Sequence, residues 1–345
     1  DSEGEEGKYY VWTSTELKEI LGELYPLFSA FYSISEEGNW EHNNNILHSF
    51  ETREEFAKRI NLEEDLVNYA LNESLNKLKE HAKTRVKPGL DNKIIACWNG
   101  LLLEALSESS ILLNHAEMKI SADNLYSFIK NQLIIDEELF RIYHEGRVNI
   151  PGFLEDYSAI INGLISYFKC TQNPEVIELA YKLTNRALKL FYDSKSDDLF
   201  FSRENEDLIV RKRDWNDDVI SSSASMFCES LLKLGHLFNN YEFIEIAKNQ
   251  INKLKDKAIK NPNWYSNWVR LILADYYGFY TICNNVESQM DAIKKLDYPF
   301  LMWVDLNQNA KLPIAIGKDQ QGIYLCRDEA CMAPVLEIKD LKLPD

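Results

Sequence analysis

The chain has 345 residues, of which 45% are hydrophobic and 27% charged, and its formal net charge at pH 7 is −17. This length can bury the core of one large domain or of two. The acidity argues against nucleic acid or an anionic membrane surface as a partner. No apolar run approaches the ~20 residues that a membrane-spanning helix needs. We therefore expect a globular protein with neither a nucleic-acid nor a membrane partner.

The first 50 residues contain a candidate binding loop. Residues 1–7 form an acidic turn with glycines, residues 8–12 resemble a short strand, and Thr13 and Glu16 have the spacing of a capping box that starts a helix. Residues 26–50 are irregular in pattern, and Trp, Glu, Asn and His gather at 37–48. Loops with such side chains often carry function. Charged, solvent-facing helices are predicted at 53–60 and 62–84.

Cysteine usage favours a reducing compartment. Cys97, Cys170 and Cys228 fall within apolar helical patterns, which predicts buried free thiols. Cys326 and Cys331 are separated by four residues and could form a disulfide or half of a metal site, but no second pair or nearby His completes such a site. We interpret them as structural or idle thiols. The chain lacks an initial Met and a signal peptide, so we expect a piece of a longer, cytoplasmic protein.

Residues 94–283 repeat one plan. Helices rich in apolar residues are predicted at 94–113, 151–170 and 219–238, and amphipathic helices follow at 117–135, 175–192 and 241–258. The first helices of successive pairs start 57 and 68 residues apart in the sequence, and short strand patterns at 138–144, 199–202 and 207–211 lie in the links. An α/α toroid consists of inner helices that alternate with outer helices, each of which exposes one face to solvent. The predicted plan fits this architecture.

A last helix at 264–283 would close the array. The predicted fold class is therefore all-α, a toroid-like array of helical hairpins with short β-hairpins in the links. Residues 286–345 change character and predict a small α/β tail packed on the helices. The predicted domains are thus 1–285 and 286–345.

Residues 151–168 suggest where a site would lie. Pro151 suits the first helical position, and the apolar residues from Phe153 to Phe168 form one wide arc with Asp156 on its edge. Asp156 either caps free backbone N–H groups, which we favour, or is an acid at the rim of a pocket. Because alternate helices run parallel, the inner-helix starts near 94, 151 and 219 should converge at one end.

Several motifs occur together along the chain: residues 1–7 with Tyr10-Val-Trp-Thr13, 37–41 with 46–48, Leu90-Asp-Asn-Lys93, Trp98-Asn-Gly100, 150–157, and Cys326-x4-Cys331-x2-Pro334. In these the sequence resembles the spermatogenesis-associated-protein-20-like family. These large thioredoxin-domain-containing proteins join an N-terminal thioredoxin-like domain to a six-hairpin glycosidase-like (α/α)6 toroid. The sequence departs from the family at His42, where Gly is usual, and at Ser221 and Ala224, where Pro and Asn are usual.

The resemblance implies an incomplete toroid that lacks its first hairpins, with the thioredoxin-like domain of the parent chain as a partner. The fold class is similar to that of α/α-toroid glycosidases and of N-acylglucosamine 2-epimerase-type isomerases. Fold analogy alone does not give a reaction.

Hydrolysis of a glycoside needs one protonated and one ionised carboxyl group. Asp156 is the candidate acid, since its apolar neighbours should raise its pKa, and Asp91 or Glu41 is the candidate base. The other candidate carboxylates at this end are Glu155, Glu3 and Glu6.

Aromatic and amide side chains complete the candidate site. Trp98, Tyr157 and Trp40 could stack on sugar rings, Asn99 and Asn39 could bind hydroxyls, and His48 lies in a family-like motif. For Trp98 a core position is favoured, because it follows Ile94 at helical spacing.

The predicted function is binding or processing of a carbohydrate or sugar derivative, with no cofactor and no metal. One alternative is a non-catalytic scaffold that serves a thioredoxin-like domain. The other is a sugar epimerase, which would need paired histidines as bases. The chain has only six, at 42, 48, 81, 115, 144 and 236, so epimerisation ranks below hydrolysis.

Overall fold

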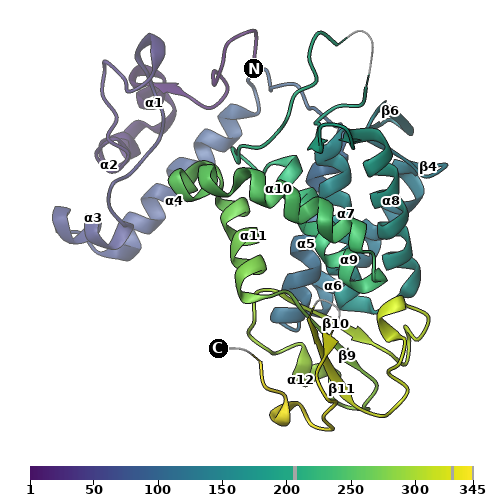
Figure 1. Ribbon diagram of the computed structural model, residues 1–345. Helices are drawn as coiled ribbons and strands as arrows, with labels where there is room; N and C mark the ends of the chain where they lie inside the picture. Colours follow the sequence, from purple (N-terminus) through teal and green to yellow (C-terminus); the bar gives the residue numbers. More distant parts are fainter. Residues whose placement is uncertain (205–207, 328–329, 344–345) are drawn as a thin grey trace. The chain divides into compact units, whose positions relative to one another are not determined.

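The computed structural model describes residues 1–345 except 205–207, 328–329 and 344–345 (Figure 1). The chain divides into two compact units, residues 1–92 and residues 93–345. Each unit has a hydrophobic core of its own.

The first unit is a small helical bundle. Its elements are β1 (Trp12–Thr13), α1 (Ser14–Leu21), α2 (Tyr25–Phe31), β2 (Asn44–Asn45), α3 (Arg53–Ile60) and α4 (Glu64–Ala82), with 3-10 turns at Gly22–Leu24 and Glu41–Asn43. β1 pairs antiparallel with β2. The prediction that residues 26–50 are irregular is wrong for the first of them, which belong to α2. Pro26 suits the first turn of α2, and Phe28 and Phe31 bury that helix in the core.

The second unit is built from helical hairpins. Its main helices are α5 (Ala96–Leu112), α6 (Ala116–Phe128), α7 (Leu154–Thr171), α8 (Pro174–Phe191), α9 (Ser223–Phe238), α10 (Tyr241–Lys260) and α11 (Ser266–Tyr277). A π-helical turn, Ile129–Leu133, follows α6, and a 3-10 turn, Pro262–Trp264, precedes α11. Each hairpin joins a helix of the inner layer to a helix of the outer layer through a short turn. Longer links connect one hairpin to the next.

Burial separates the inner helices from the outer ones. α7 is buried around almost its whole circumference and packs against α5 on one side and α9 on the other. α8 and α10 bury one face only and keep a charged face in solvent. This alternation confirms the predicted array of helical hairpins with an inner and an outer layer, in a mostly helical chain with small sheets.

Glycines allow α5 and α7 to pack closely. A Cβ atom added to Gly100 would lie 2.4 Å from the backbone carbon of Ala159, and one added to Gly163 would lie 2.6 Å from the Gly100 carbonyl oxygen. The Trp98-Asn-Gly100 motif therefore owes its glycine to a helix–helix contact. This contact fixes the start of α5 beside the start of α7.

Short strands occupy the links. They are β3 (Ile94–Ile95), β4 (Ile134–Ile135), β5 (Glu138–His144), β6 (Arg147–Pro151), β7 (Tyr192–Asp193) and β8 (Asp198–Leu199). β5 pairs with β3, β4 and β6. Pro151 ends β6 opposite Phe140, so its predicted place as the first helical residue is wrong. Residues 208–211 form no strand, and Asp207 of that predicted strand lies outside the described residues.

The last predicted helix ends earlier than expected. α11 stops at Tyr277, because Gly278 adopts a φ of 104° that favours glycine, and the chain continues as a strand. The remaining elements are β9 (Tyr280–Asn284), α12 (Met290–Ile293), β10 (Leu301–Asp305), β11 (Ile323–Arg327) and β12 (Ala330–Cys331), with 3-10 turns at Pro313–Ala315 and Ile338–Asp340. The sheet order is β10-β9-β11-β12, with β9 and β10 parallel.

The sheet holds a disulfide. Cys326 on β11 and Cys331 on β12 are bonded to each other across the strand pair. Our interpretation of these two residues as free thiols is wrong, and the disulfide alternative is correct. The strand pairing places their Cα atoms 4.0 Å apart. Cys97 and Cys228 are free and buried, as predicted, whereas Cys170 is free but only half-buried, and Cys283 is also free and buried.

Candidate functional site

The starts of the inner helices are joined to one another by hydrogen bonds. The Asp156 Oδ1 atom in α7 accepts from the Cys97 N–H at the start of α5, at 3.1 Å. The Ser158 hydroxyl in α7 donates to the Ser223 carbonyl at the start of α9, at 3.0 Å. The first turns of these three parallel helices therefore lie side by side, as predicted.

A second carboxylate links α9 to α11. Asp217 accepts from the Ser222 N–H, at 2.8 Å, and from the Asn267 N–H, also at 2.8 Å. Ser222 is the N-cap of α9, and Asn267 lies in the first turn of α11. A carboxylate that receives N–H groups from two helix starts neutralises the positive ends of both dipoles. Sequence analysis missed Asp217, which precedes the helix in an irregular stretch.

Asp156 is fully buried and satisfied by N–H donors. Besides the Cys97 N–H, its carboxylate accepts from the Phe153 N–H at 2.9 Å and from Arg141 Nη1 at 3.0 Å. Burial raises the pKa of Asp156, and the donors from Phe153 and Arg141 oppose that effect. The favoured interpretation of Asp156 as a capping residue is confirmed. Its role as a general acid stays a prediction, because a closed site gives a substrate no access to it.

Residues next to Asp156 differ in exposure. Glu155 pairs with Arg141 at 2.5 Å, and both side chains are about one-fifth to one-quarter exposed. Trp98 is 64% exposed, so the favoured core position for this residue is wrong.

Asn99 and Tyr157 have internal partners. The Asn99 amide donates to the Ile95 carbonyl of its own helix, at 2.8 Å. The Tyr157 ring is completely buried, and its hydroxyl accepts from the Leu139 N–H in β5, at 3.1 Å. Both side chains thus hold α5, α7 and β5 in place, and their predicted contacts with a ligand stay predictions.

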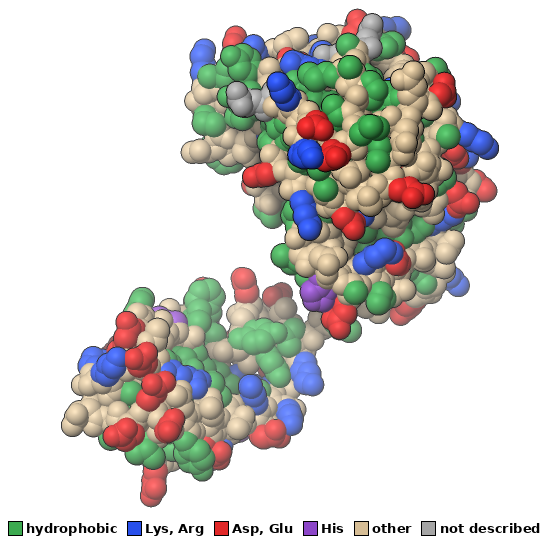
Figure 2. All heavy atoms as spheres, turned by 90° about the horizontal axis from the view of Figure 1, so that it is seen from below, with side chains coloured by type: hydrophobic (Ala, Val, Ile, Leu, Met, Phe, Trp, Pro, Cys, Tyr) green, Lys and Arg blue, Asp and Glu red, His purple; other side chains and the backbone are tan. Residues whose placement is uncertain are grey.

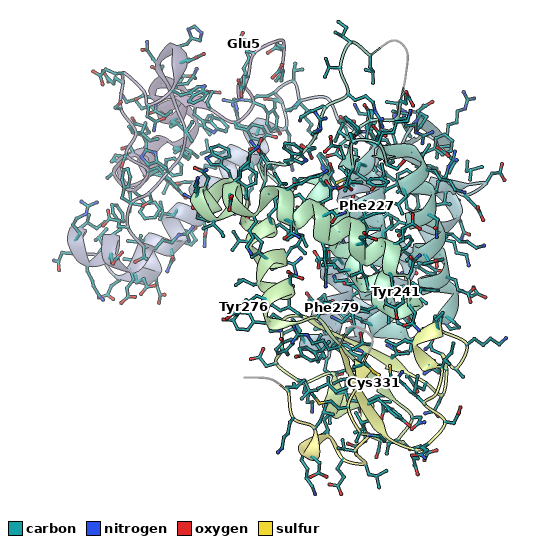
Figure 3. All side chains as sticks on the ribbon, viewed as in Figure 1. Glu5, Phe227, Tyr241, Tyr276, Phe279 and Cys331 are labelled. Carbon is teal, nitrogen blue, oxygen red and sulfur yellow. A yellow bond between two sulfur atoms is a disulfide. The ribbon has the colours of Figure 1, made fainter. Side chains whose placement is uncertain are left out.

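The first unit contains a cavity of about 600 Å³ that brings several predicted residues together. Trp40 and Glu41 line it from the loop, and Glu3 and Glu6 line it from the N-terminal turn. The remaining lining residues are Ser2, Glu5, Lys8, Tyr9, Val11, Glu16, His42, Asn44, Thr84, Arg85 and Val86. Figure 3 labels Glu5 on the N-terminal loop of this unit. The candidate binding loop therefore does line a cavity.

Arg85 organises the walls of this cavity. Its guanidinium donates to the carbonyls of Tyr9 (2.8 Å) and Val11 (2.9 Å), and it pairs with Glu16 at 2.6 Å. It also stacks on the Trp12 ring, 3.7 Å from the centroid. Glu16 therefore gives its carboxylate to Arg85, and only half of the predicted capping box forms, with Thr13 accepting from the Glu16 N–H. Nothing in the sequence around Arg85 indicated this role.

Glu41 and Trp40 differ from the paired residues of the cavity. Among the described residues, no cation pairs with the Glu41 carboxylate, whereas Glu16 is held by Arg85 and Glu5 by Lys8 at 3.0 Å. Trp40 is 41% exposed. An open carboxylate next to a half-exposed indole is free to meet a ligand.

Asn39 and His48 hold the loop together. The Asn39 side chain accepts from the Ile46 N–H at 2.7 Å, donates to the Ile46 carbonyl at 3.0 Å, and lies 3.2 Å from His48 Nδ1. These bonds close the loop on which Trp40 and Glu41 lie. Asp91 is exposed near the end of the same unit.

Asp156 belongs to the second unit, whereas Glu41 and Asp91 belong to the first. The pairing of Asp156 with either of them therefore stays a prediction.

The described part of the chain has neither a cluster of metal ligands nor a membrane-spanning helix. No three or more His, Cys, Asp or Glu side chains there are grouped so that they could hold a metal ion. No helix within the described ranges is long and apolar enough to cross a membrane. On the face drawn in Figure 2, acidic and basic side chains are interspersed, with no basic stripe.

Comparison with known proteins gives one consistent relationship. Over 98% of its length the chain is 25% identical to spermatogenesis-associated protein 20 of Mus musculus and 26% identical to that of Homo sapiens. The chain is a distant homologue of this protein. It spans about half (49%) of the length of these relatives. No family model matches the chain.

Solved structures overlap with parts of the chain. A sugar epimerase from a ruminal bacterium covers 49% of the chain at 18% identity with a TM-score of 0.41, and the match covers 46% of that protein. The unsaturated glucuronyl hydrolase of Bacillus sp. GL1 covers 54% at 16% identity with a TM-score of 0.40, and the match covers 57% of that protein. Overlaps of this size carry no argument about what the chain binds.

Proposed function

We propose that the chain binds a carbohydrate or sugar derivative and that the 600 Å³ cavity of the first unit is the binding site. The observation that carries the proposal is the meeting of Trp40, Glu41, Glu3 and Glu6 in one cavity. Its volume lies in the usual range for small-molecule sites.

The lining suits sugar hydroxyls. Ionised carboxylates only accept hydrogen bonds, so they bind O–H groups well, while Arg85 and Lys8 are donors at the same cavity. An exposed indole face offers apolar surface to the C–H face of a pyranose ring. We assign Trp40 as the stacking platform and Glu41 as the main acceptor. The acidic lining repels phosphate groups, which favours neutral sugars over nucleotides.

Hydrolysis is the finer part of the proposal. It requires Asp156, the candidate general acid, to become accessible, and the candidate bases Glu41 and Asp91 belong to the other unit, so no pairing with them is proposed. The raised pKa of Asp156 supports the acid role. The burial of its carboxylate supports the rival proposal, a non-catalytic module that serves a thioredoxin-like domain of a longer protein. Epimerisation has less support, since a single histidine among the described residues, His42, lines this cavity.

The test is a thermal-shift panel of monosaccharides and oligosaccharides on the chain and on its full-length parent. We expect at least one sugar to raise the melting temperature. Trp40→Ala and Glu41→Gln should each lower the affinity for that sugar about tenfold, equivalent to roughly 1.4 kcal/mol. Glu23→Gln is the matched control, because Glu23 is exposed in the same unit and does not line the cavity.

Asp156→Asn separates binding from hydrolysis. If Asp156 is the acid, this variant should bind sugar normally and release no product from an oligosaccharide that the parent cleaves. If no sugar in the panel shifts the melting temperature of either protein, the carbohydrate proposal fails and the scaffold proposal replaces it.

A further inference from the structure

The second unit contains a separate cavity, of about 220 Å³, in the middle of the inner helices. Its walls come from α5, α7, α9 and α11 and from residues 299–302 at the start of β10. Phe279, labelled in Figure 3 where α11 leads into the sheet, also lines it. None of these residues belongs to the site proposed above.

Six charged side chains face this cavity, at least one from each inner helix. They are Glu104 and Glu108 on α5, Lys169 on α7, Glu229 and Lys233 on α9, and Arg270 on α11. The other lining residues are apolar: Leu232, Leu271, Ala274, Phe279, Pro299, Phe300, Leu301 and Met302. Charged groups from four helices that meet among apolar walls are unusual in a core, because each costs desolvation.

Five of the six charges are paired with one another. Lys169 pairs with Glu108 at 2.9 Å, and its ammonium group lies 4.5 Å from the Trp303 ring centroid. Glu229 pairs with Lys233 at 2.6 Å and also with Arg270. Burial alone would raise the pKa of Glu229, but Lys233 and Arg270 outweigh it and hold that pKa well below its usual range.

Glu104 is the exception. Within the described residues, no side chain or backbone N–H donates to its carboxyl group, and no cation forms an ion pair with it. Burial raises the pKa of Glu104, Lys233 opposes this, and the nearby carboxylates Glu229 and Glu108 add to it. The Glu104 side chain is half-buried, so its unpartnered carboxyl group is partly desolvated and remains open to a hydrogen-bonding group in the cavity.

We propose that this cavity binds a neutral, hydroxylated molecule of monosaccharide size, with the Glu104 carboxyl group as its main hydrogen-bonding partner. At about 30 Å³ for each water molecule, the volume corresponds to roughly seven waters. This is the size of one sugar ring or cyclic polyol and excludes an oligosaccharide, whereas the cavity of the first unit has room for more.

Hydroxyl groups suit this lining better than a charged ligand. Each hydroxyl both donates and accepts, so it can bind to the ammonium groups as well as to the carboxyl groups of the walls. The three carboxyl groups and three cations nearly balance, which leaves no strong preference for a free anion or cation. The apolar residues of β10 and α11 offer a surface for the C–H groups of the ring.

The experiment uses D-glucose, D-mannose, N-acetyl-D-glucosamine and myo-inositol as probes, with calorimetry on the whole chain. Glu104→Leu removes the hydrogen-bonding group, and Glu104→Gln keeps its size and polarity. We expect at least one probe to bind, Glu104→Leu to weaken it about tenfold or more, and Glu104→Gln to stay within about threefold. Ala274→Phe, which fills the cavity, should also abolish binding.

Two controls keep the outcomes distinct. Without sugar, Glu104→Leu should melt at the same or a higher temperature, because it removes an unpartnered polar group, so lost binding cannot be attributed to unfolding. All titrations are made in a Glu41→Gln background, so that binding at the first unit's cavity is weakened, and Glu23→Gln, outside both cavities, should leave this binding unchanged. The proposal is overturned if no probe binds this background chain, or if Glu104→Leu in it binds a probe as tightly as the background chain does.

Discussion

Asp156 is a fully buried acid and Glu104 a half-buried acid on neighbouring inner helices, and burial raises the pKa of each. They differ in their partners. Asp156 receives N–H donors from Cys97, Phe153 and Arg141, whereas Glu104 has no such donor among the described residues. A pKa raised by burial therefore does not by itself separate a structural carboxylate from a functional one. The number of hydrogen bonds that each carboxyl group accepts does separate them. It indicates a structural role for Asp156 and supports the proposed ligand-binding role of Glu104.

The largest expected effect comes from removing the satisfied carboxylate. Asp156→Ala leaves the Cys97 N–H, the Phe153 N–H and the Arg141 guanidinium without an acceptor, and it should lower the free energy of unfolding by about 3 kcal/mol. Urea denaturation measures this. Glu155→Ala removes a partly exposed partner of the same arginine and should cost less than about 1 kcal/mol. Equal effects of the two variants would contradict the structural role of Asp156.

The next effect tests the contact that holds the starts of α5 and α7 together. Gly100→Ala places a Cβ atom 2.4 Å from the Ala159 backbone, so the helices must move apart, and we expect a loss of about 2 kcal/mol. Gly89→Ala is the control, because nothing lies within 4 Å of its added Cβ. If Gly100→Ala unfolds at the same urea concentration as the natural chain, the inner layer is looser than the structure indicates.

The inner layer could be predicted from the sequence because its signals are local and repeated. Apolar residues at helical spacing identified α5, α7 and α9, and the parallel inner layer implied that their starts converge. The errors have equally local causes. Pro151 is compatible with a helix start and with a strand end, and only its pairing with Phe140 decides. Gly278 ends α11 inside a stretch of apolar residues. The strand that follows, β9, has only five residues, so the alternation typical of a strand cannot be recognised in the sequence.

The chemistry was harder to predict, because it depends on contacts between distant residues. The loop with Trp40 and Glu41 was found from composition, and its neighbours Glu3 and Glu6 were named with it. Arg85, which holds that cavity together from 69 residues beyond Glu16, gives no local signal.

Glu104 was missed for a different reason. It is one acidic residue on α5, a helix whose apolar residues at helical spacing indicate that the helix packs in the core. The lack of a partner that makes it informative is visible only in the folded chain.

A smaller effect separates the two acids by pH. A carboxyl group whose folded pKa lies above its ordinary value of 4.5 binds its proton more tightly in the folded state. Stability should therefore fall as the pH rises from that value through the raised pKa. Glu104→Gln removes this dependence. Urea denaturation from about pH 5 to about pH 8 should show the natural chain losing more stability than the variant.

Asp156 titrates in both proteins, so the difference between the two pH profiles isolates Glu104. Parallel profiles would contradict the raised pKa of Glu104 in the folded chain.

The smallest effect concerns an aromatic residue rather than an acid. Trp98 is 64% exposed, whereas Trp268 is completely buried and donates through its indole N–H to the Trp215 carbonyl at 2.8 Å. Trp98→Ala should change the free energy of unfolding by no more than about 0.5 kcal/mol, and Trp268→Ala should cost more than about 3 kcal/mol. A large loss from Trp98→Ala would restore the core interpretation. A small loss leaves an exposed indole one residue from Cys97, where it contributes little to stability and remains available to a ligand or partner.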